Sequence, residues 1–237
     1  MALDFLSDIE LYFSIYIMAN QISITGEECH HLMKVMRHTV GDTIYVTDGN
    51  GNIYKTKITS TAKNEVKTEV VEKFAYENTL KNITICIPRL RISDRLEFAV
   101  EKCVELGITQ FVVFESERAI AKGDKSDRWK KILQAAMKQS LRSYLPSIKY
   151  ISSYPKLESL EGRKVVFDQN AGTKFTKFVE DIDLNQKYIF IFGPEGGLTE
   201  DELNHFSDAE KCVLTKNRLR AETAVITGAA VIANLLD

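Results

Sequence analysis

A glycine-rich stretch, Phe-Gly-Pro-Glu-Gly-Gly at residues 192–197, has the residue types and the setting of a ligand-binding loop. It follows the apolar run Tyr188–Phe192, which predicts a buried strand. It precedes Thr199-Glu-Asp-Glu202, a capping box that predicts the start of a helix. Glycines allow close backbone approach, and amides at a helix N-terminus can face a ligand. The stretch matches neither G-x-G-x-x-G nor a P-loop, and the Glu195 carboxylate would repel a phosphate, so we expect a ligand other than a polyphosphate.

The bulk properties are those of an ordinary globular protein. The chain has 237 residues, a net charge of −2, 44% apolar residues and 27% charged residues, which allows one large domain or two modest ones. No apolar run is long enough to span a bilayer. The early residues carry acids and no Lys or Arg, unlike a secretory signal. The four cysteines lack C-x-x-C spacing, which favours reduced, buried thiols in a cytoplasmic protein.

The charges are unevenly distributed along the chain. Residues 1–28 hold five acids and no Lys or Arg, whereas residues 118–149 hold nine Lys or Arg and two acids. Residues 211–220 hold four basic residues and no acid. Such clusters either create a local positive field on a nearly neutral protein or form solvated helix faces.

The first part of the chain predicts a small β-barrel. Short runs rich in β-branched residues are separated by turn residues, with Asp48-Gly-Asn-Gly51 as a hairpin signal. A helix is expected over about 27–37, and residues 74–80 form a candidate linker. The expected strands cover residues 11–17, 21–24, 43–47, 53–59 and 66–71.

From about residue 82 the pattern alternates between strand and helix, which predicts a mostly parallel sheet covered on both faces. The glycine loop follows one of its strands. The expected strands cover 83–87, 111–114, 164–167, 188–192 and 212–214. The expected helices cover 94–106, 127–144, a stretch from about 200, and 222–236.

The final helix is apolar on nearly all sides, so it must be buried on both sides. Its small residues, such as Ala224 and Gly228, permit close packing of backbones. Burial by a second subunit would satisfy this pattern, and burial within one chain is the alternative.

Five stretches, one of which is the glycine loop, make the chain recognisable. They are His30-His-Leu-Met-Lys-Val-Met-Arg37 with Gly41-Asp42, Glu105-Leu-Gly-Ile108 with Glu117-Arg118, Arg128-Trp129 with Ala135-Ala-Met-Lys-Gln-Ser-Leu-Arg142, Gly193-Pro-Glu-Gly-Gly197, and Leu219-Arg-Ala-Glu-Thr-Ala224. In order and spacing they resemble the RsmE family of 16S rRNA (uracil-N3) methyltransferases, of the SPOUT superfamily. The resemblance runs from about residue 11 to 237. One departure is Thr215-Lys-Asn217, where the family usually has Gly-Pro-Arg.

The resemblance implies a fold and partners. It implies a PUA-like β-barrel domain for RNA contact, which we place at residues 1–75. It implies an α/β SPOUT methyltransferase domain with a trefoil knot, which we place at residues 76–237. The expected cofactor is S-adenosylmethionine, the expected substrate is 16S rRNA of the small ribosomal subunit, and the expected assembly is a homodimer. No membrane partner is expected.

Site residues follow from the matched motifs. The cofactor-binding candidates are Phe192, Gly193, Pro194, Glu195, Gly196, Gly197, Leu214, Leu219, Thr223 and Ala224. Glu195 would orient the cofactor or accept a proton, or else form a structural bond. Leu219 is either part of the pocket wall or part of the core.

The catalytic candidates are Arg220, Glu222 and Thr223. Because N3 of neutral uracil carries a proton, the reaction needs a proton acceptor or a positive group that stabilises the anion. Arg220 suits the second role, whereas Glu222 and Thr223 either act on the base or cap the last helix.

The RNA-binding candidates are Lys34, Arg37, Arg118 and Arg142. His30 and His31 lack a third ligand with suitable spacing, so no metal site is expected. Three other functions stay open: ribose 2′-O-methylation of RNA, a non-catalytic RNA-binding or ribosome-assembly factor, and a small-molecule methyltransferase.

Overall fold

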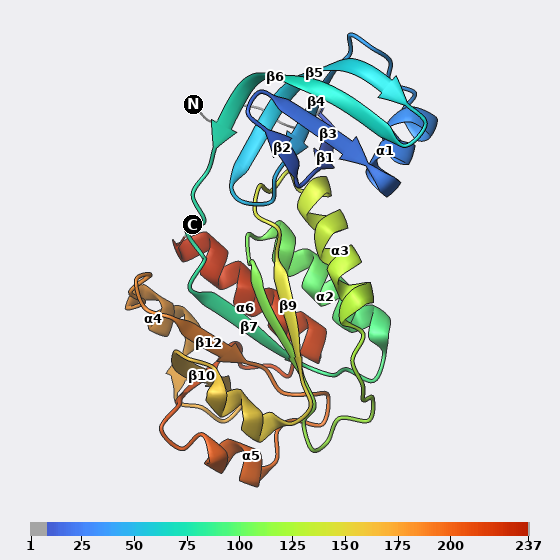
Figure 1. Cartoon of the computed structure of the whole chain (residues 1–237). Helices are drawn as coiled ribbons and strands as arrows, with labels where there is room; N and C mark the ends of the chain where they lie inside the picture. The colour runs from blue at the N-terminus through green and yellow to red at the C-terminus, as the bar shows by residue number, and fades with distance from the viewer. Residues whose placement is uncertain (1–8, 237) are drawn as a thin grey trace. The chain divides into compact units, whose positions relative to one another are not determined.

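The computed structural model describes residues 9–236, which form two compact units (Figure 1). The first unit contains the described residues up to 78 together with residues 137–145. The second contains residues 79–136 and the rest of the described chain from 146 onward. The chain therefore passes between the units three times.

A six-stranded sheet forms the first unit, in the order β1-β4-β5-β6-β3-β2. Its neighbouring strands are antiparallel except β1 and β4, which are parallel. Alternate apolar side chains, such as Ile22, Ile24, Ile44 and Val46, face a common core. The strands are β1 (Leu11–Phe13), β2 (Tyr16–Met18), β3 (Gln21–Thr25), β4 (Thr43–Thr47), β5 (Asn52–Ala62) and β6 (Glu65–Ala75).

Two local expectations for this unit can be compared with the structure. The turn Asp48-Gly-Asn-Gly51 does join the antiparallel strands β4 and β5, and the Asp48 carboxylate accepts hydrogen bonds from the amides of Asn50 and Asn52. The single strand expected over residues 11–17 is wrong, because the chain bends at Ile15 and forms β1 and β2 instead. The Ser14 hydroxyl stabilises this bend by donating to the carbonyl of Ser23 and accepting from the amide of Tyr16.

The helix expected over 27–37 changes its winding part-way. Helix α1 (Gly26–His30) continues directly into the π-helical turn η1 (His31–Val35). The wider turn is held by the amide of Met36, which donates to the carbonyl of His31 five residues earlier. Arg37 then takes a positive φ of 60°, which ends the helix.

The helix expected over 127–144 is shorter than predicted. Helix α3 (Ser126–Gln139) ends because Leu141 takes a left-handed conformation with φ of 56°. The following residues pack within the first unit. The carbonyl of Ser143 accepts from the Gly51 amide, and the Tyr144 hydroxyl donates to the carbonyl of Tyr76.

The second unit has a seven-stranded sheet in the order β11-β13-β10-β12-β7-β8-β9, and every neighbouring pair is parallel (Figure 1). The predicted parallel α/β sheet is therefore confirmed. The strands are β7 (Ile83–Pro88), β8 (Gln110–Phe114), β9 (Ser147–Ile151), β10 (Arg163–Phe167), β11 (Thr173–Lys174), β12 (Tyr188–Ile191) and β13 (Glu210–Val213).

Both faces of this sheet are covered, so every residue of strand β12 is buried. Ile189 and Ile191 pack in one core with residues of η2 (Tyr154–Ser159) and α5 (Glu200–His205). Phe190 faces the other side, where its ring meets Phe167 and Phe175. That side also holds α2 (Ser93–Glu105), α4 (Phe175–Glu180) and α6 (Ala221–Leu236), and α6 contacts both α2 and α4.

The elements β9, β11, α4 and η2 were not anticipated, because they are short and carry little periodic signal. The capping box of α5 is present as expected: the Thr199 hydroxyl accepts from the Glu202 amide, and the Glu202 carboxylate accepts from the Thr199 amide. All four cysteines are free and buried. Within residues 9–236, no helix has the length and apolar character needed to cross a membrane.

Candidate active site

Three loops meet at one edge of the parallel sheet. Because β13, β10 and β12 are adjacent and parallel, the loops that follow them leave from the same edge, where open α/β sheets bind ligands. These loops are residues 168–172, 192–199 and 214–220. The sheet thus brings together the two C-terminal stretches that the sequence singled out.

The glycine loop is a tight turn with exposed backbone. The Gly197 amide donates to the carbonyl of Pro194 at 2.8 Å, and Gly197 has a φ of +72°, which favours glycine. Gly196 and Gly197 are exposed, whereas Pro194 is buried. A Cβ on Gly193 would lie 3.3 Å from Cγ of Leu198, so a larger residue here would have to displace the Leu198 side chain slightly.

Side chains join the three loops. Arg218 donates from Nη2 to the carbonyl oxygen of Glu195 at 3.1 Å, which links the two C-terminal motifs. Gln169 donates from Nε2 to the carbonyls of Thr215 and Lys216 at 3.1 and 3.3 Å. The unusual Thr215-Lys-Asn217 segment is therefore joined to the loop that follows β10.

The Glu195 side chain points to a fourth loop. Its Oε1 accepts a hydrogen bond from the Arg91 amide at 3.3 Å, just beyond the end of β7. This is the structural bond that the sequence left open as one of three roles for Glu195, and it connects the glycine loop to the segment before α2.

Arg118 is adjacent to the same loop. Its Nη1 donates to the carbonyl of Gly196 at 2.8 Å. The preceding residue, Glu117, accepts from the Thr199 hydroxyl through Oε2, and its amide donates to Oε1 of Glu202. Residues 117–118 therefore hold the turn between the glycine loop and α5.

The start of α6 carries the three catalytic candidates. Arg220 and Thr223 are exposed, whereas Glu222 is 9% exposed. Oε1 of Glu222 lies 3.6 Å from Nε of Arg95 on α2, and its buried Oε2 has no hydrogen-bond partner among the described residues. Glu222 thus pairs with a neighbouring helix, while Arg220 and Thr223 are open to a ligand.

An aromatic stack connects the glycine loop to α6. Phe192 is buried and stacks on Phe167 with ring centroids 4.2 Å apart. A Cβ on Gly228 of α6 would lie 2.7 Å from Cζ of Phe192, so only glycine leaves room for this ring. The other cofactor candidates Leu214, Leu219 and Ala224 are half-buried at the same edge.

The remaining RNA-binding candidates lie in the first unit. Lys34 is in η1 and Arg37 follows it, and both are exposed. Arg142 belongs to the 137–145 segment and is half-buried. The structure therefore divides the predicted RNA contacts between the units, with Arg118 in the second. Among residues 9–236, no three His, Cys, Asp or Glu side chains are grouped in a way that could hold a metal ion.

The sequence missed three residues that shape this edge: Arg91, Arg95 and Gln169. Gln169 had a usable signal, because Asp168-Gln-Asn-Ala-Gly172 directly follows a predicted strand. Arg91 and Arg95 had none, since their partners Glu195 and Glu222 are more than a hundred residues away in the chain.

The comparisons with known proteins agree with this geometry. A family model described as an RNA methyltransferase domain matches residues 77–233, and one described as an RNA methyltransferase PUA domain matches residues 24–71. Ribosomal RNA small subunit methyltransferase E of Bacillus subtilis is 32% identical over 90% of each chain. This chain belongs to that methyltransferase family.

Further members and structures support the assignment. The Synechocystis methyltransferase E is 25% identical over 91% of this chain and 74% of its own length. A crystal structure of the Neisseria gonorrhoeae enzyme, bound to S-adenosyl methionine, has 26% identity and a TM-score of 0.84, covering 96% of this chain and 98% of that one. As a family member, the protein has the predicted PUA-like domain followed by a SPOUT-like parallel-sheet domain.

Proposed function

We propose that this protein transfers a methyl group from S-adenosylmethionine to N3 of a uridine in 16S rRNA of the small ribosomal subunit. The observation that carries the proposal is the meeting of the two C-terminal motifs, joined by the Arg218–Glu195 bond, in a chain whose relatives are named as small-subunit rRNA methyltransferases. The PUA-type first unit supports an RNA substrate rather than a small molecule.

The residues at this edge fit the cofactor. Exposed backbone at Gly196, Gly197 and Lys216–Arg218 offers amides and carbonyls to a nucleoside, while Leu214 and Leu219 offer partly buried apolar surface. When bound, the cofactor supplies an electrophilic methyl group on a sulfonium. We propose that residues 192–197, 214, 219, 223 and 224 hold it, and that the loops between β10 and α6 form the trefoil knot, which their cross-loop bonds support.

The chain's own residues would handle the uracil. N3 becomes nucleophilic only when its proton is lost, which places negative charge on the ring and its carbonyl oxygens. We propose that exposed Arg220 stabilises this charge and that Thr223 hydrogen-bonds the base. Glu222, held by Arg95, would fix the start of α6 so that both side chains face the base.

Two further parts of the proposal concern location and assembly. We propose a cytoplasmic homodimer, in which the N-terminal stretch of the first domain ends near residue 75 and residues 137–145 complete that domain. Exposed apolar surface on α6 supports the dimer. Thr227 and Val231 are half-buried and Leu235 is 52% exposed on this apolar helix. Phe98, on the neighbouring helix α2, is 49% exposed and would add to the same apolar surface.

Nucleoside mass spectrometry tests the reaction. Small subunits from a strain lacking the gene should lack 3-methyluridine in 16S rRNA and regain it on incubation with the purified protein and S-adenosylmethionine. A 2′-O-methylated nucleoside would mean ribose chemistry, and no new nucleoside would favour a binding factor. For the dimer, Leu235→Arg should give a folded monomer in light scattering, whereas Asn234→Arg should leave the assembly unchanged; a dimeric Leu235→Arg variant contradicts this interface.

A further inference from the structure

The glycine loop is held by two neighbouring loops of the second unit. Strands β12, β7 and β8 are adjacent and parallel, so the loops that follow them leave from the same edge of the sheet. In the segment after β7, the Arg91 amide donates to Glu195, and in the loop after β8, Arg118 donates to the carbonyl of Gly196. The shape of the glycine loop therefore depends on how these two supporting loops are fixed.

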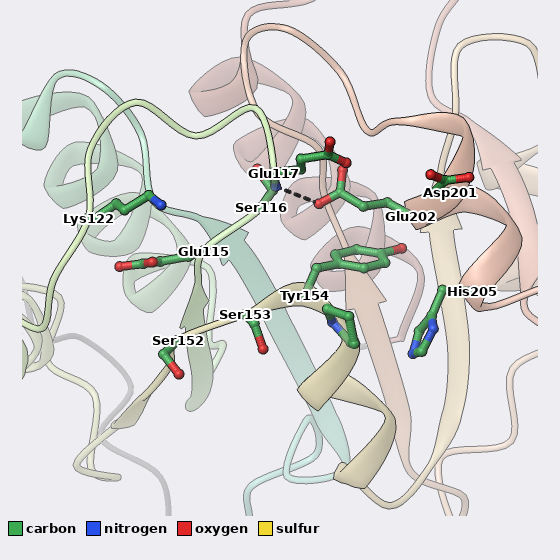
Figure 2. Close-up of a pocket in the computed structure, with 11 residues that line it drawn as sticks. Glu115, Ser116, Glu117, Lys122, Ser152, Ser153, Tyr154, Asp201, Glu202 and His205 are labelled. Carbon is green, nitrogen blue, oxygen red and sulfur yellow. Dashed lines mark hydrogen bonds between the residues drawn. The ribbon is translucent and has the colours of Figure 1, made fainter.

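The loop after β8 is only partly packed against the rest of the unit. Its residues 115–117 and 122 line a cavity of about 490 Å³ beside α5 (Figure 2), and its Ile120 is 72% exposed. Near its start the loop is tied to α5, because the Glu117 amide donates to Glu202. The position of the rest of the loop depends on the bonds at its other end, which is Gly123.

Gly123 is held through both of its main-chain polar groups. Its amide donates to Oε1 of Glu115 at 2.7 Å, and its carbonyl oxygen accepts from Nε of Arg89 at 3.2 Å. The Tyr150 hydroxyl also donates to Oε1 of Glu115. The bonds from Tyr150 and Gly123 hold the pKa of Glu115 below its ordinary value, so this carboxylate is ionised at neutral pH. Gly123 thus lies between a carboxylate and a guanidinium.

Arg89 joins the two supporting loops directly. It follows β7, lies two residues before Arg91, and is 2% exposed. Its amide donates to the carbonyl of Phe114, at the end of β8, at 2.7 Å. Its guanidinium carbon lies 5.3 Å from the centre of the Trp129 ring. The bond from its Nε to Gly123 then ties the end of the loop after β8 to the segment that carries Arg91.

Stability does not explain why an arginine is buried here. Nη1 of Arg89 is buried and has no hydrogen-bond partner among residues 9–236. A buried cation whose donors are only partly used costs folding free energy, so an apolar side chain of similar length would suit the fold at least as well. Positions that break such a rule are expected at functional sites, and Arg89 lies behind one.

We propose that Arg89 is a positioning residue for cofactor binding. It holds the loop after β8 against the segment after β7, and so keeps Arg118 on the carbonyl of Gly196. The inference rests on the proposed place of S-adenosylmethionine at residues 192–197. Because Arg89 is 2% exposed, it acts through these loops and not by contact with the cofactor.

Calorimetry and urea unfolding of Arg89→Met in the full chain test the inference. Affinity for S-adenosylmethionine should fall about fivefold, the effect of one lost hydrogen bond. The urea midpoint should stay the same or rise, because a buried charge has been removed. A structural role alone predicts the reverse, a lower midpoint with unchanged affinity of the folded protein, and that result overturns the inference.

A double variant shows whether Arg89 acts through Arg118. In the Arg118→Met background, Arg89→Met should weaken cofactor binding by less than about twofold, because residues that act through one contact do not have additive effects. The same fivefold loss in both backgrounds overturns the inference.

Gly123→Ala tests the same bond without removing a buried side chain. Gly123 has a φ of +92° and a Cβ there would meet nothing within 4 Å, so the substitution acts through the backbone alone. Cofactor affinity should fall at least about twofold. Gly41→Ala is the matched control, since Gly41 lies in the first unit with a φ of +99° and equally open surroundings. It should leave cofactor affinity unchanged, and equal affinities of the two variants overturn the inference.

Methyl transfer by the wild-type protein separates this inference from the proposed function. If the wild type forms 3-methyluridine in small subunits but Arg89→Met binds the cofactor as tightly as the wild type, only the role of Arg89 fails. If Arg89 and Arg118 are coupled in cofactor binding as expected but no 3-methyluridine forms, the proposed function fails instead.

Discussion

Nη1 of Arg118 and the carbonyl oxygen of Gly196 lie 2.8 Å apart, so a side chain 78 residues earlier in the sequence fixes the backbone of the glycine loop. The bond is charge-assisted. Because the acceptor is a main-chain oxygen, the bond constrains the path of the backbone at residue 196 directly. Arg118 therefore supports the loop's shape, whatever else its exposed guanidinium contacts.

Arg118→Met should weaken S-adenosylmethionine binding about tenfold, as expected for loss of a hydrogen bond to a charged donor. Calorimetry measures this directly. Arg37→Ala in the first unit is the matched control, expected to reduce affinity for small subunits while leaving cofactor affinity unchanged. If Arg118→Met lost only affinity for small subunits, its role in the loop would be disproved.

Gly228→Ala should destabilise the protein although alanine is the better helix former. The added Cβ would lie 2.7 Å from Cζ of Phe192, and such overpacking costs about 1–3 kcal/mol against a gain of about 1 kcal/mol in helix propensity. Phe192 leads into the glycine loop, so cofactor affinity should fall as well. Urea unfolding and calorimetry measure the two effects.

Gly172→Ala is the control for this substitution, because a Cβ there would meet nothing within 4 Å. It should be neutral in both measurements. A Gly228→Ala protein as stable as the wild type would mean that the aromatic stack shifts without cost.

Arg95→Met should cost more stability than Glu222→Gln. The Glu222 side chain is 12% exposed and that of Arg95 is 33% exposed. Removing the arginine leaves a buried carboxylate unpaired, at about 3 kcal/mol, whereas the reverse change leaves an arginine that reaches water, at about 1 kcal/mol.

Urea unfolding of both single variants and of the double variant gives the coupling free energy between Arg95 and Glu222. The two costs should not add, because one pair accounts for both. Additive costs, or the opposite order, would show that Arg95 and Glu222 do not stabilise each other.

Arg220→Ala should lower the methylation rate at least about a hundredfold, the usual effect of removing one group that stabilises developing charge. Cofactor affinity should stay within a few fold, because the Arg220 side chain is exposed. Single-turnover methylation of small subunits measures the rate, with Lys216→Ala as a control from the same loop. Loss of folding or of cofactor binding in Arg220→Ala would instead give this arginine a structural role.

Features determined by neighbouring residues were predicted well. The capping box at Thr199 and Glu202, the hairpin at Asp48, and the strand before the glycine loop all depend on contacts within a few residues. The family motifs also singled out the loops after β12 and β13, and the structure brings these two loops together. Their role as the site stays a prediction.

Other features depend on partners that are distant in the sequence. Helix α3 stops at Gln139 because Leu141 takes a left-handed conformation, after which residues 143 and 144 bond to residues 51 and 76 of the first unit. The Arg95–Glu222 and Arg91–Glu195 contacts join segments that no local pattern connects. The cavity beside α5 could not be predicted either, since three separate segments form it.

The first unit is assembled from two stretches of chain, and this affects how it can be expressed and studied by itself. Lys138 forms an ion pair with Glu28, and the carbonyl of Ser143 accepts from both Gly51 and the Thr47 hydroxyl. An expression fragment ending near residue 78 would omit these partners and expose the surface they cover. Exchange of the first unit between relatives therefore has to transplant the 137–145 stretch along with the N-terminal one.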